Sequence, residues 1–376
     1  MSWFSVIPTT STEFVPRKGE CGKRIVGYYI GWDSKEITHS QLSKLTHVVY
    51  CCLALNLTDV AFFKDVESRR EFLDIRNQAR SSNTGVKVMA SIGGSKFTLN
   101  SIISFIKEYT IDGIDIYWEE PNKDGTDREN YVALVRDLRL KLTNLQESQS
   151  RTFPYILTVL TPSHDWTLED GIDLNGLAEY VDFFNVATDD YTVSWSSTLG
   201  YYTKPHAPLY PGSGAKPKYN VDWAMRYYTC ETKTPQKLNM GLPFFGRYWK
   251  NVLDPIAKND KMWRKVEVVK GEVDKGMVVW KNLQREGWNI SNVEWDEKTE
   301  SSYIWEPEKR WFLGIDDERN LKEKMKYVKE KNLGGVMIWT VEMDDYSDTL
   351  LSTVASVDFC DDQMEERKNE IKYKCH

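Results

Sequence analysis

The chain has 376 residues, of which 41% are hydrophobic, and a formal net charge of −7 with a pI near 5.5. A chain of this length buries a large core in one domain, or in one domain with an insertion, so it is not a small stapled module. No stretch combines clustered Lys and Arg with aromatic residues, which argues against a nucleic-acid partner. No window reaches the roughly 18 apolar residues that a membrane span requires.

Eight apolar, β-branched runs recur along the chain, each of strand length. They are 25–30, 47–55, 86–92, 113–119, 155–161, 181–187, 237–244 and 335–341. Between several of them apolar residues recur at three- and four-residue steps, as at Tyr131, Leu134, Val135, Leu138 and Leu142, or at Leu321, Met325 and Val328. Alternation of strand and helix predicts a parallel sheet, and eight such units are the number that closes a (β/α)8 TIM barrel of the α/β class.

The regular spacing breaks between Phe244 and Gly334, where a segment of mixed charge and tryptophan replaces the single expected helix. We predict a small inserted α+β subdomain at 249–317, within a barrel that spans 24–356. Short strand-like pieces inside it lie at 277–280 and 303–305. Residues 1–23 are then an N-terminal extension, and 357–376 a charged C-terminal tail.

The fourth run, Asp112-Gly-Ile-Asp-Ile-Tyr-Trp-Glu119, places polar groups on one face of a strand. Because side chains alternate along a strand, Asp115, Tyr117 and Glu119 share one face, and Trp118 lies on the other, where it should pack against helices. An unpartnered buried carboxylate is costly, so these acids favour a solvated or catalytic cavity. The alternative is a pair of satisfied structural acids. At the barrel face formed by strand C-termini, Asp189, Asp190 and Glu342 would join Glu119.

Cysteine and histidine patterns favour neither a metal site nor a catalytic triad. The six cysteines, at 21, 51, 52, 230, 360 and 375, include no Cys-x-x-Cys pair and no histidine at zinc spacing, and their pairing is unreadable. At least one of Cys51 and Cys52 is expected to be a small buried hydrophobe in its strand. No serine or cysteine stands in a nucleophile motif. No metal or organic cofactor is predicted.

Five motifs in order make the chain resemble family 18 of the glycoside hydrolases, the chitinases, and in particular their degenerate chitinase-like branch. The motifs are Val-Gly-Tyr-Tyr-Ile-Gly-Trp at 26–32, Lys-Val-Met-Ala-Ser-Ile-Gly-Gly at 87–94, the run 112–119, Gly-Leu-Pro-Phe-Phe-Gly-Arg at 241–247 and Gly-Gly-Val-Met-Ile-Trp at 334–339. The family is also known for an insertion between its last two strands. The resemblance covers about Arg24 to Ser356.

In such enzymes the substrate's own N-acetyl oxygen attacks the anomeric carbon. The resemblance implies that Glu119 is the general acid, with Asp115 in the same acidic run. The acid that orients the acetamido group is replaced by Tyr117, and the tyrosine of the family's Met-x-Tyr-Asp pattern is replaced by Asp189, beside a retained Asp190. A phenol carries no charge to stabilise a cationic intermediate, so hydrolysis should suffer heavily. The alternative is an active hydrolase in which Asp189 compensates for Tyr117.

Sugar recognition is partly kept in the motifs. Trp339 matches the tryptophan under the scissile sugar, and Tyr28, Trp32 and Arg247 match further binding positions, with Asp190. Three contacts differ from the family pattern, at Ser95, Phe245 and Ile315.

We expect a lectin-like pseudoenzyme whose partner is chitin or an N-acetylglucosamine oligosaccharide. A third possibility is an immune-interaction protein with a vestigial groove, whose protein partner the sequence does not reveal. The resemblance implies secretion, and the sequons at Asn56 and Asn289 agree. The opening residues Met1 to Pro8, however, do not form a signal peptide as written.

Overall fold

The computed structural model describes most of the chain. The described residues are 22–31, 36–55, 61–81, 84–93, 98–118, 126–164, 168, 171–191, 201–212, 217–258, 260–359 and 370–375. Among them no helix is both long and apolar enough to cross a membrane.

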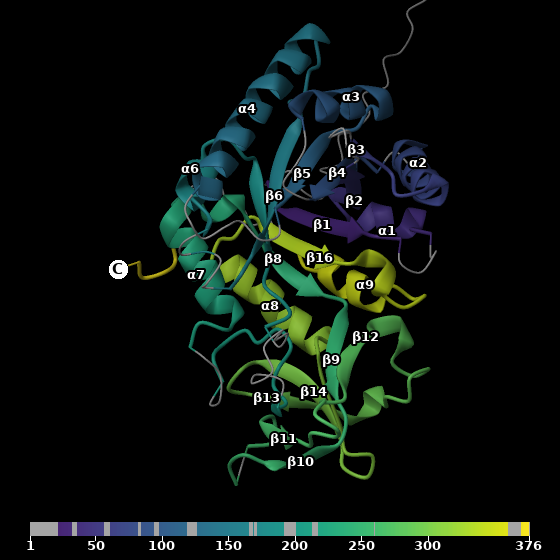
Figure 1. Ribbon diagram of the computed structural model, residues 1–376, viewed down its shortest axis with the longest axis vertical. Coiled ribbons are helices and arrows are strands. Elements are labelled where there is room, and N and C mark those ends of the chain that lie inside the picture. The colour runs from purple at the N-terminus through teal and green to yellow at the C-terminus, as the bar shows by residue number, and fades with distance from the viewer. Residues whose placement is uncertain are drawn as a thin grey trace, which may run out of the picture.

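Eight parallel strands close into a barrel, which confirms the predicted (β/α)8 fold (Figure 1). They are β1 (Arg24–Tyr29), β2 (His47–Leu55), β4 (Lys87–Gly93), β5 (Gly113–Tyr117), β6 (Ile156–Pro162), β7 (Phe183–Ala187), β8 (Leu238–Pro243) and β16 (Gly335–Trp339). The sheet runs β1-β16-β8-β7-β6-β5-β4-β2, and pairing of β1 with β2 closes it. A short β3 (Ala61–Phe62) pairs antiparallel with β2. Every predicted run overlaps one of the eight barrel strands.

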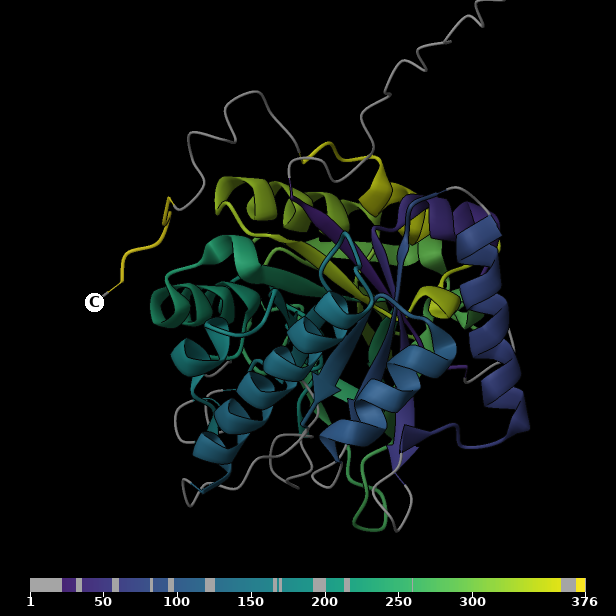
Figure 2. The same cartoon turned by 90° about the horizontal axis from the view of Figure 1, so that it is seen from above.

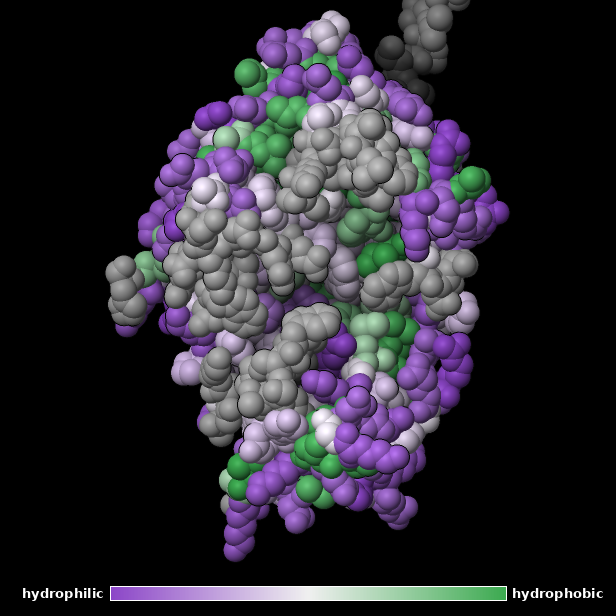
Figure 3. All heavy atoms as spheres, in the orientation of Figure 1, coloured by the Kyte–Doolittle hydropathy of each residue, from purple (hydrophilic) through white to green (hydrophobic). Residues whose placement is uncertain are grey.

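Helices lie outside the strands, as the view from above shows (Figure 2). They are α1 (His39–Lys44), α2 (Val66–Ser81), α3 (Leu99–Tyr109), α4 (Thr126–Ser148), α6 (Leu174–Ala178), α7 (Val221–Thr232), α8 (Glu318–Glu330) and α9 (Thr349–Ala355). The two predicted helical patterns form α4 and α8, and their apolar positions face the barrel. Hydrophilic residues dominate the rim of the face drawn in Figure 3. Most large apolar side chains of the described residues are buried in the core.

A second, antiparallel sheet lies between β8 and β16 in the chain and below the barrel in Figure 1. Its strands are β12 (Lys275–Val279), β9 (Phe245–Trp249), β15 (Trp311–Ile315), β14 (Ser301–Glu306) and β13 (Val293–Asp296), in that spatial order. A hairpin of β10 (Val252–Pro255) and β11 (Arg264–Val266) flanks it, and 3₁₀ turns lie at Pro235–Lys237, Trp280–Asn282, Ile290–Asn292 and Val341–Met343. The first strand of this sheet, β9, begins at Phe245, and only Phe244 separates it from the end of β8.

Two disulfides are present among the described residues. Cys230 in α7 pairs with Cys375, which ties the segment 370–375 to that helix. Cys51 is buried, as expected of at least one of the neighbouring cysteines, but it is bonded to the exposed Cys52. Cys21 and Cys360 lie outside the described residues.

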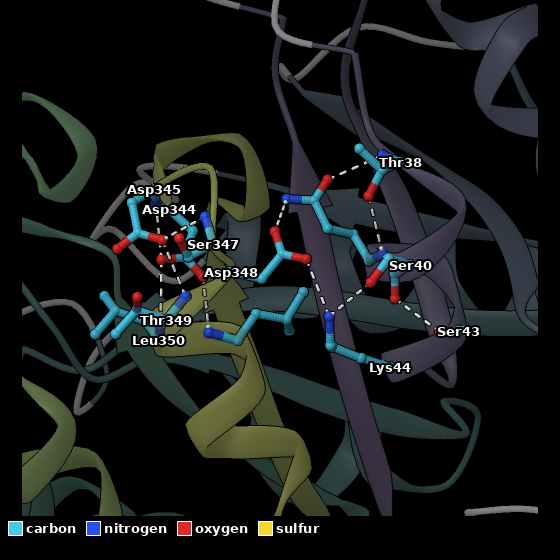
Figure 4. Close-up of polar contacts among 12 residues, drawn as sticks. Thr38, Ser40, Ser43, Lys44, Asp344, Asp345, Ser347, Asp348, Thr349 and Leu350 are labelled. Carbon is cyan, nitrogen blue, oxygen red and sulfur yellow. Dashed lines mark hydrogen bonds and ion pairs between the residues drawn. The ribbon is translucent and has the colours of Figure 1, made fainter.

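Buried aspartates fix the segment that follows β16 against the start of the barrel (Figure 4). The carboxylate of Asp344 accepts hydrogen bonds from the backbone N–H groups of Leu350 (3.2 Å) and Leu351 (2.8 Å) at the start of α9. Asp348 accepts from Gln41 Nε2 at 2.8 Å and pairs with Lys44 Nζ at 3.0 Å, both in α1. Helix α1, near the start of the barrel sequence, is thus held to the start of α9, near its end.

Replacement of Asp344 by Ala should lower the free energy of unfolding by ~2–4 kcal/mol, because buried N–H donors at the start of α9 lose their acceptor. Urea unfolding measures the change, with Asp254→Ala at an exposed position as the matched control. Equal urea midpoints for the two variants would contradict the structural role of Asp344.

Candidate functional site

The C-terminal ends of the barrel strands gather most of the predicted site residues at one mouth. Trp339 ends β16 and Tyr117 ends β5, while Asp189 and Asp190 come after β7, separated from it by Thr188. Arg247 comes from β9, the first strand of the inserted sheet. Of the remaining predicted residues, Glu119, Trp32 and Ser95 lie outside the described residues.

Asp115 lies deeper in the barrel and has no exposed surface. Four side chains donate to its carboxylate, and each comes from a different strand. They are Tyr28 Oη (2.9 Å), Ser91 Oγ (2.7 Å), Thr158 Oγ1 (2.6 Å) and Asn185 Nδ2 (3.5 Å). Burial raises the pKa of Asp115, while these hydrogen bonds oppose the rise. This is the arrangement of a satisfied structural acid, the alternative that the sequence left open.

A chain of polar groups continues from Asp115 toward the opposite end of the barrel. Asn185 Nδ2 also donates to Tyr28 Oη at 2.9 Å, and Asn239 Nδ2 donates to Asn185 Oδ1 at 2.9 Å. Arg24 Nε then donates to Asn239 Oδ1 at 3.0 Å. Burial lowers the pKa of Arg24 to about 10, against the attraction of Asp182.

Three further residues of this network, Thr158, Asn185 and Asn239, were not predicted from the sequence. Each is a polar residue inside an otherwise apolar strand, at an alternating position that turns it inward. That parity was the available signal, and it is the same signal that singled out Asp115.

Aromatic rings form the wall above Asp115. The rings of Tyr28 and Trp339 lie 5.5 Å apart between centroids and are tilted by 40°. Tyr117 and Trp339, both half-buried, pack on the same apolar cluster inside the barrel. Trp118 faces outward and packs on Tyr131 of α4 at 5.2 Å, as predicted. The half-buried Trp339 therefore lies between the buried Tyr28 ring and the mouth.

An ion pair joins the inserted sheet to the barrel mouth. Arg247 Nε donates to Asp190 Oδ1 at 2.7 Å, and the second guanidinium nitrogen reaches Oδ2, so the pair is bidentate. His206 Nδ1 lies 3.8 Å from Asp190 Oδ1, and Phe245 packs edge-on against the His206 ring at 4.6 Å. Burial lowers the pKa of His206 to about 3, so the ring is neutral.

Asp189 is 8% exposed and lies close to a second, fully buried ion pair. That pair joins Lys324 of α8 to Asp316, which follows β15. Burial, then the neighbouring charge of Asp190, raises the pKa of Asp189 to about 7. Burial likewise raises the pKa of Asp316 to about 6. No described residue forms a hydrogen bond or ion pair with Asp189.

Glu342 and Ile315 are buried in structural positions. Glu342 Oε1 accepts from the backbone N–H groups of Ile30 (2.8 Å) and Gly31 (3.2 Å), and burial raises its pKa. Ile315 belongs to the large apolar core. Within the described part of the chain, no group of three or more His, Cys, Asp or Glu side chains is placed to hold a metal ion.

The model of the family "Glycosyl hydrolases family 18" matches residues 24–344. The chain belongs to this family. A probable endochitinase from Caenorhabditis elegans is 25% identical over 295 residues, which are 72% of this chain and 46% of that protein. The chain thus spans less than half the length of this family 18 relative.

Solved structures of a chitinase and of a pseudo-chitinase share the fold at low sequence identity. An immunomodulatory active chitinase from Trichuris suis, TsES1, superposes with a TM-score of 0.74 at 20% identity, over 88% of this chain and 99% of that one. Human YKL-39 is described as a pseudo-chitinase with retained chitooligosaccharide binding properties. It also superposes with a TM-score of 0.74 at 20% identity, over 88% of this chain and 98% of that one. Active and inactive relatives therefore share this barrel.

Replacement of Asp189 by Asn should flatten part of the pH dependence of stability. The native pKa of about 7 lies above that of an exposed aspartate, so the native state binds the proton more tightly than the unfolded chain. The contribution of this proton to the free energy of unfolding is largest below about pH 4, and it is lost as the pH rises to about 7.

Asp189→Asn has no such proton to lose. Between about pH 4.5 and about pH 7.5 its free energy of unfolding should therefore rise by ~2–4 kcal/mol relative to that of wild type. Urea unfolding at both pH values measures it, with the exposed Asp254→Asn as control. A difference between wild type and variant that is the same at both pH values would contradict the raised pKa.

Proposed function

We propose that this chain is a chitinase-like member of family 18, of the degenerate branch, that binds N-acetylglucosamine-type glycans at the barrel mouth and hydrolyses chitin inefficiently. The observation that carries the proposal is Tyr117 at the end of β5, two residues after the buried Asp115. In the family pattern this position holds the acid that orients the acetamido group.

The loss of that acid acts directly on the chemical step. Tyr117 is a neutral group where a carboxylate would stabilise the positive charge that develops on the sugar. The Asp115 carboxylate below it is already bound by four donors, so it is held in place by the barrel interior. Glu119 keeps the position of the general acid in the sequence, but its usual assistant is missing.

Binding depends on groups that remain. The half-buried Trp339 presents an apolar ring face for stacking under a sugar, and Tyr28 supports it from within the barrel. The Arg247–Asp190 pair offers charged hydrogen-bonding groups at the same mouth. Retained oligosaccharide binding in the pseudo-chitinase YKL-39, which has the same fold, supports this division between binding and catalysis.

A second candidate function is hydrolysis by a rearranged site. Asp189 supplies a carboxyl at the mouth, and burial raises its pKa to about 7, a value suited to proton transfer near neutral pH. In this alternative Glu119 is the general acid and Asp189 takes over the work of the missing aspartate. The requirement is severe, because a misplacement of about 1 Å costs roughly a hundredfold in rate.

Replacement of Trp339 by Ala should weaken binding of N-acetylglucosamine oligomers by roughly tenfold or more, because the stacking surface is removed. Isothermal titration measures the affinity. Trp223→Ala, at a ring that stacks on Tyr227 in α7, is the matched control and should bind normally. Unchanged affinity in a folded Trp339→Ala protein would contradict the sugar floor.

Product release from N-acetylglucosamine oligomers should stay near background for wild type and be unchanged in Glu119→Gln. The double change Tyr117→Asp with Asp189→Tyr restores the family pattern and should raise turnover by roughly a hundredfold, since it returns one electrostatic contact to the transition state. Wild-type turnover that disappears in Glu119→Gln would instead establish the rearranged hydrolase.

A further inference from the structure

The 3₁₀ turn that precedes β13 carries the triplet Asn289-Ile290-Ser291, one of the two Asn-x-Ser/Thr triplets of the chain. Such a triplet is an acceptor for N-linked glycans, but only where the asparagine is accessible on the protein surface. The sequence alone leaves that requirement open. The structure describes 260–359 without a gap, so the chain on both sides of Asn289 is defined. The other triplet begins at Asn56, which lies outside the described residues.

The triplet lies on an open part of the surface. Asn289 and Ser291 are exposed, and so are the residues 284–287 before them. Trp288 is only 3% exposed and packs on Trp311 of β15, with 5.3 Å between the ring centroids, so the turn is anchored to the inserted sheet just before Asn289. The turn leads into β13, an edge strand of that sheet (Figure 1). A bulky group attached at Asn289 therefore has space in solvent.

The side-chain amide of Asn289 is only weakly held. Its Nδ2 donates to Oδ1 of the exposed Asn292 at 3.4 Å, which is long for an N–H···O hydrogen bond. Its Oδ1 accepts from the backbone N–H of Ser291 at 3.1 Å. Attachment of a sugar replaces one of the two hydrogens on Nδ2, so it disturbs at most one long hydrogen bond at the surface. The fold therefore tolerates a glycan at this position.

A separate feature of the structure fits the compartment in which N-linked glycans are attached. Cys230 of α7 forms a disulfide with Cys375, across 145 positions of the chain, with the two Cα atoms 5.4 Å apart. Structural disulfides form and persist in oxidising compartments such as the lumen of the secretory pathway. The disulfide and the exposed triplet thus point to the same environment.

We propose that Asn289 is an N-glycosylation site. The donor is an oligosaccharide linked to a lipid diphosphate. Nδ2 of Asn289 forms a bond to C1 of the first sugar, and the bond from that carbon to the diphosphate oxygen breaks. The lipid diphosphate leaves with the bonding electron pair, and Nδ2 gives up one proton. This modification belongs to the surface of the inserted sheet and is independent of the sugar-binding function proposed for the barrel mouth.

The test produces the full chain behind a cleavable signal peptide in a eukaryotic cell line. Trypsin releases the peptide 286–298, which contains this triplet and no other. A glycosidase that cleaves the glycan–asparagine bond, used in heavy-oxygen water, converts a glycosylated asparagine into a labelled aspartate, which mass spectrometry locates. We expect the label at Asn289 in the greater part of the peptide. Removal of the signal peptide, read from the N-terminal peptide, shows that the chain has reached the lumen.

Four variants test whether the modification depends on the triplet. Asn289→Gln and Ser291→Ala should abolish the label, whereas Ser291→Thr keeps the hydroxyl and should retain it. Asn292→Gln changes an exposed asparagine of the same turn and is the matched control, which should remain labelled at Asn289.

Two results overturn the proposal. The first is an unlabelled peptide 286–298 in protein from which the signal peptide has been removed, whether that protein is secreted or retained in the cell. The second is a label that persists in Ser291→Ala, because the modification would then not depend on the triplet.

Discussion

The buried carboxylate of Asp115 is the constraint on which the interior of this barrel depends. A carboxylate with no exposed surface is stable only if its oxygens are hydrogen-bonded, and here the donors come from β1, β4, β6 and β7 around β5. Since one group ties four strands to a fifth, their relative heights are fixed at that level. Tyr28, Asn185, Asn239 and Arg24 then extend the bonding through the barrel.

The aromatic wall of the mouth is built on this polar base. The hydroxyl of Tyr28 is held by Asp115 and Asn185, while its ring lies against Trp339. The orientation of the indole face is therefore linked to a network that lies below it. Tyr117 ends the same strand as Asp115 and packs against the same apolar cluster as Trp339. The aromatic wall and Tyr117 are thus both connected to the strand that carries Asp115.

The inserted sheet contributes charge as well as shape. Arg247 in β9 and Asp316 after β15 belong to that sheet or its edge, and both lie close to the end of β7. Arg247 forms an ion pair with Asp190 that links the sheet to the barrel. Asp316 forms a second, buried ion pair with Lys324 of α8. Asp189 lies close to both pairs, and burial together with the charge of Asp190 raises its pKa to about 7.

The sequence by itself determined the eight strands, the place of the insertion and the inward face of β5, because periodicity and spacing along the chain encode them directly. It also marked Trp339, Arg247 and Asp190, since each stands in a motif. Only the tertiary structure decided that Asp115 is fully satisfied and that Asp189 lies close to Lys324 and Asp316. Burial and the electrostatic field at a side chain depend on groups far away in the chain, and no local pattern records which of them the fold brings together.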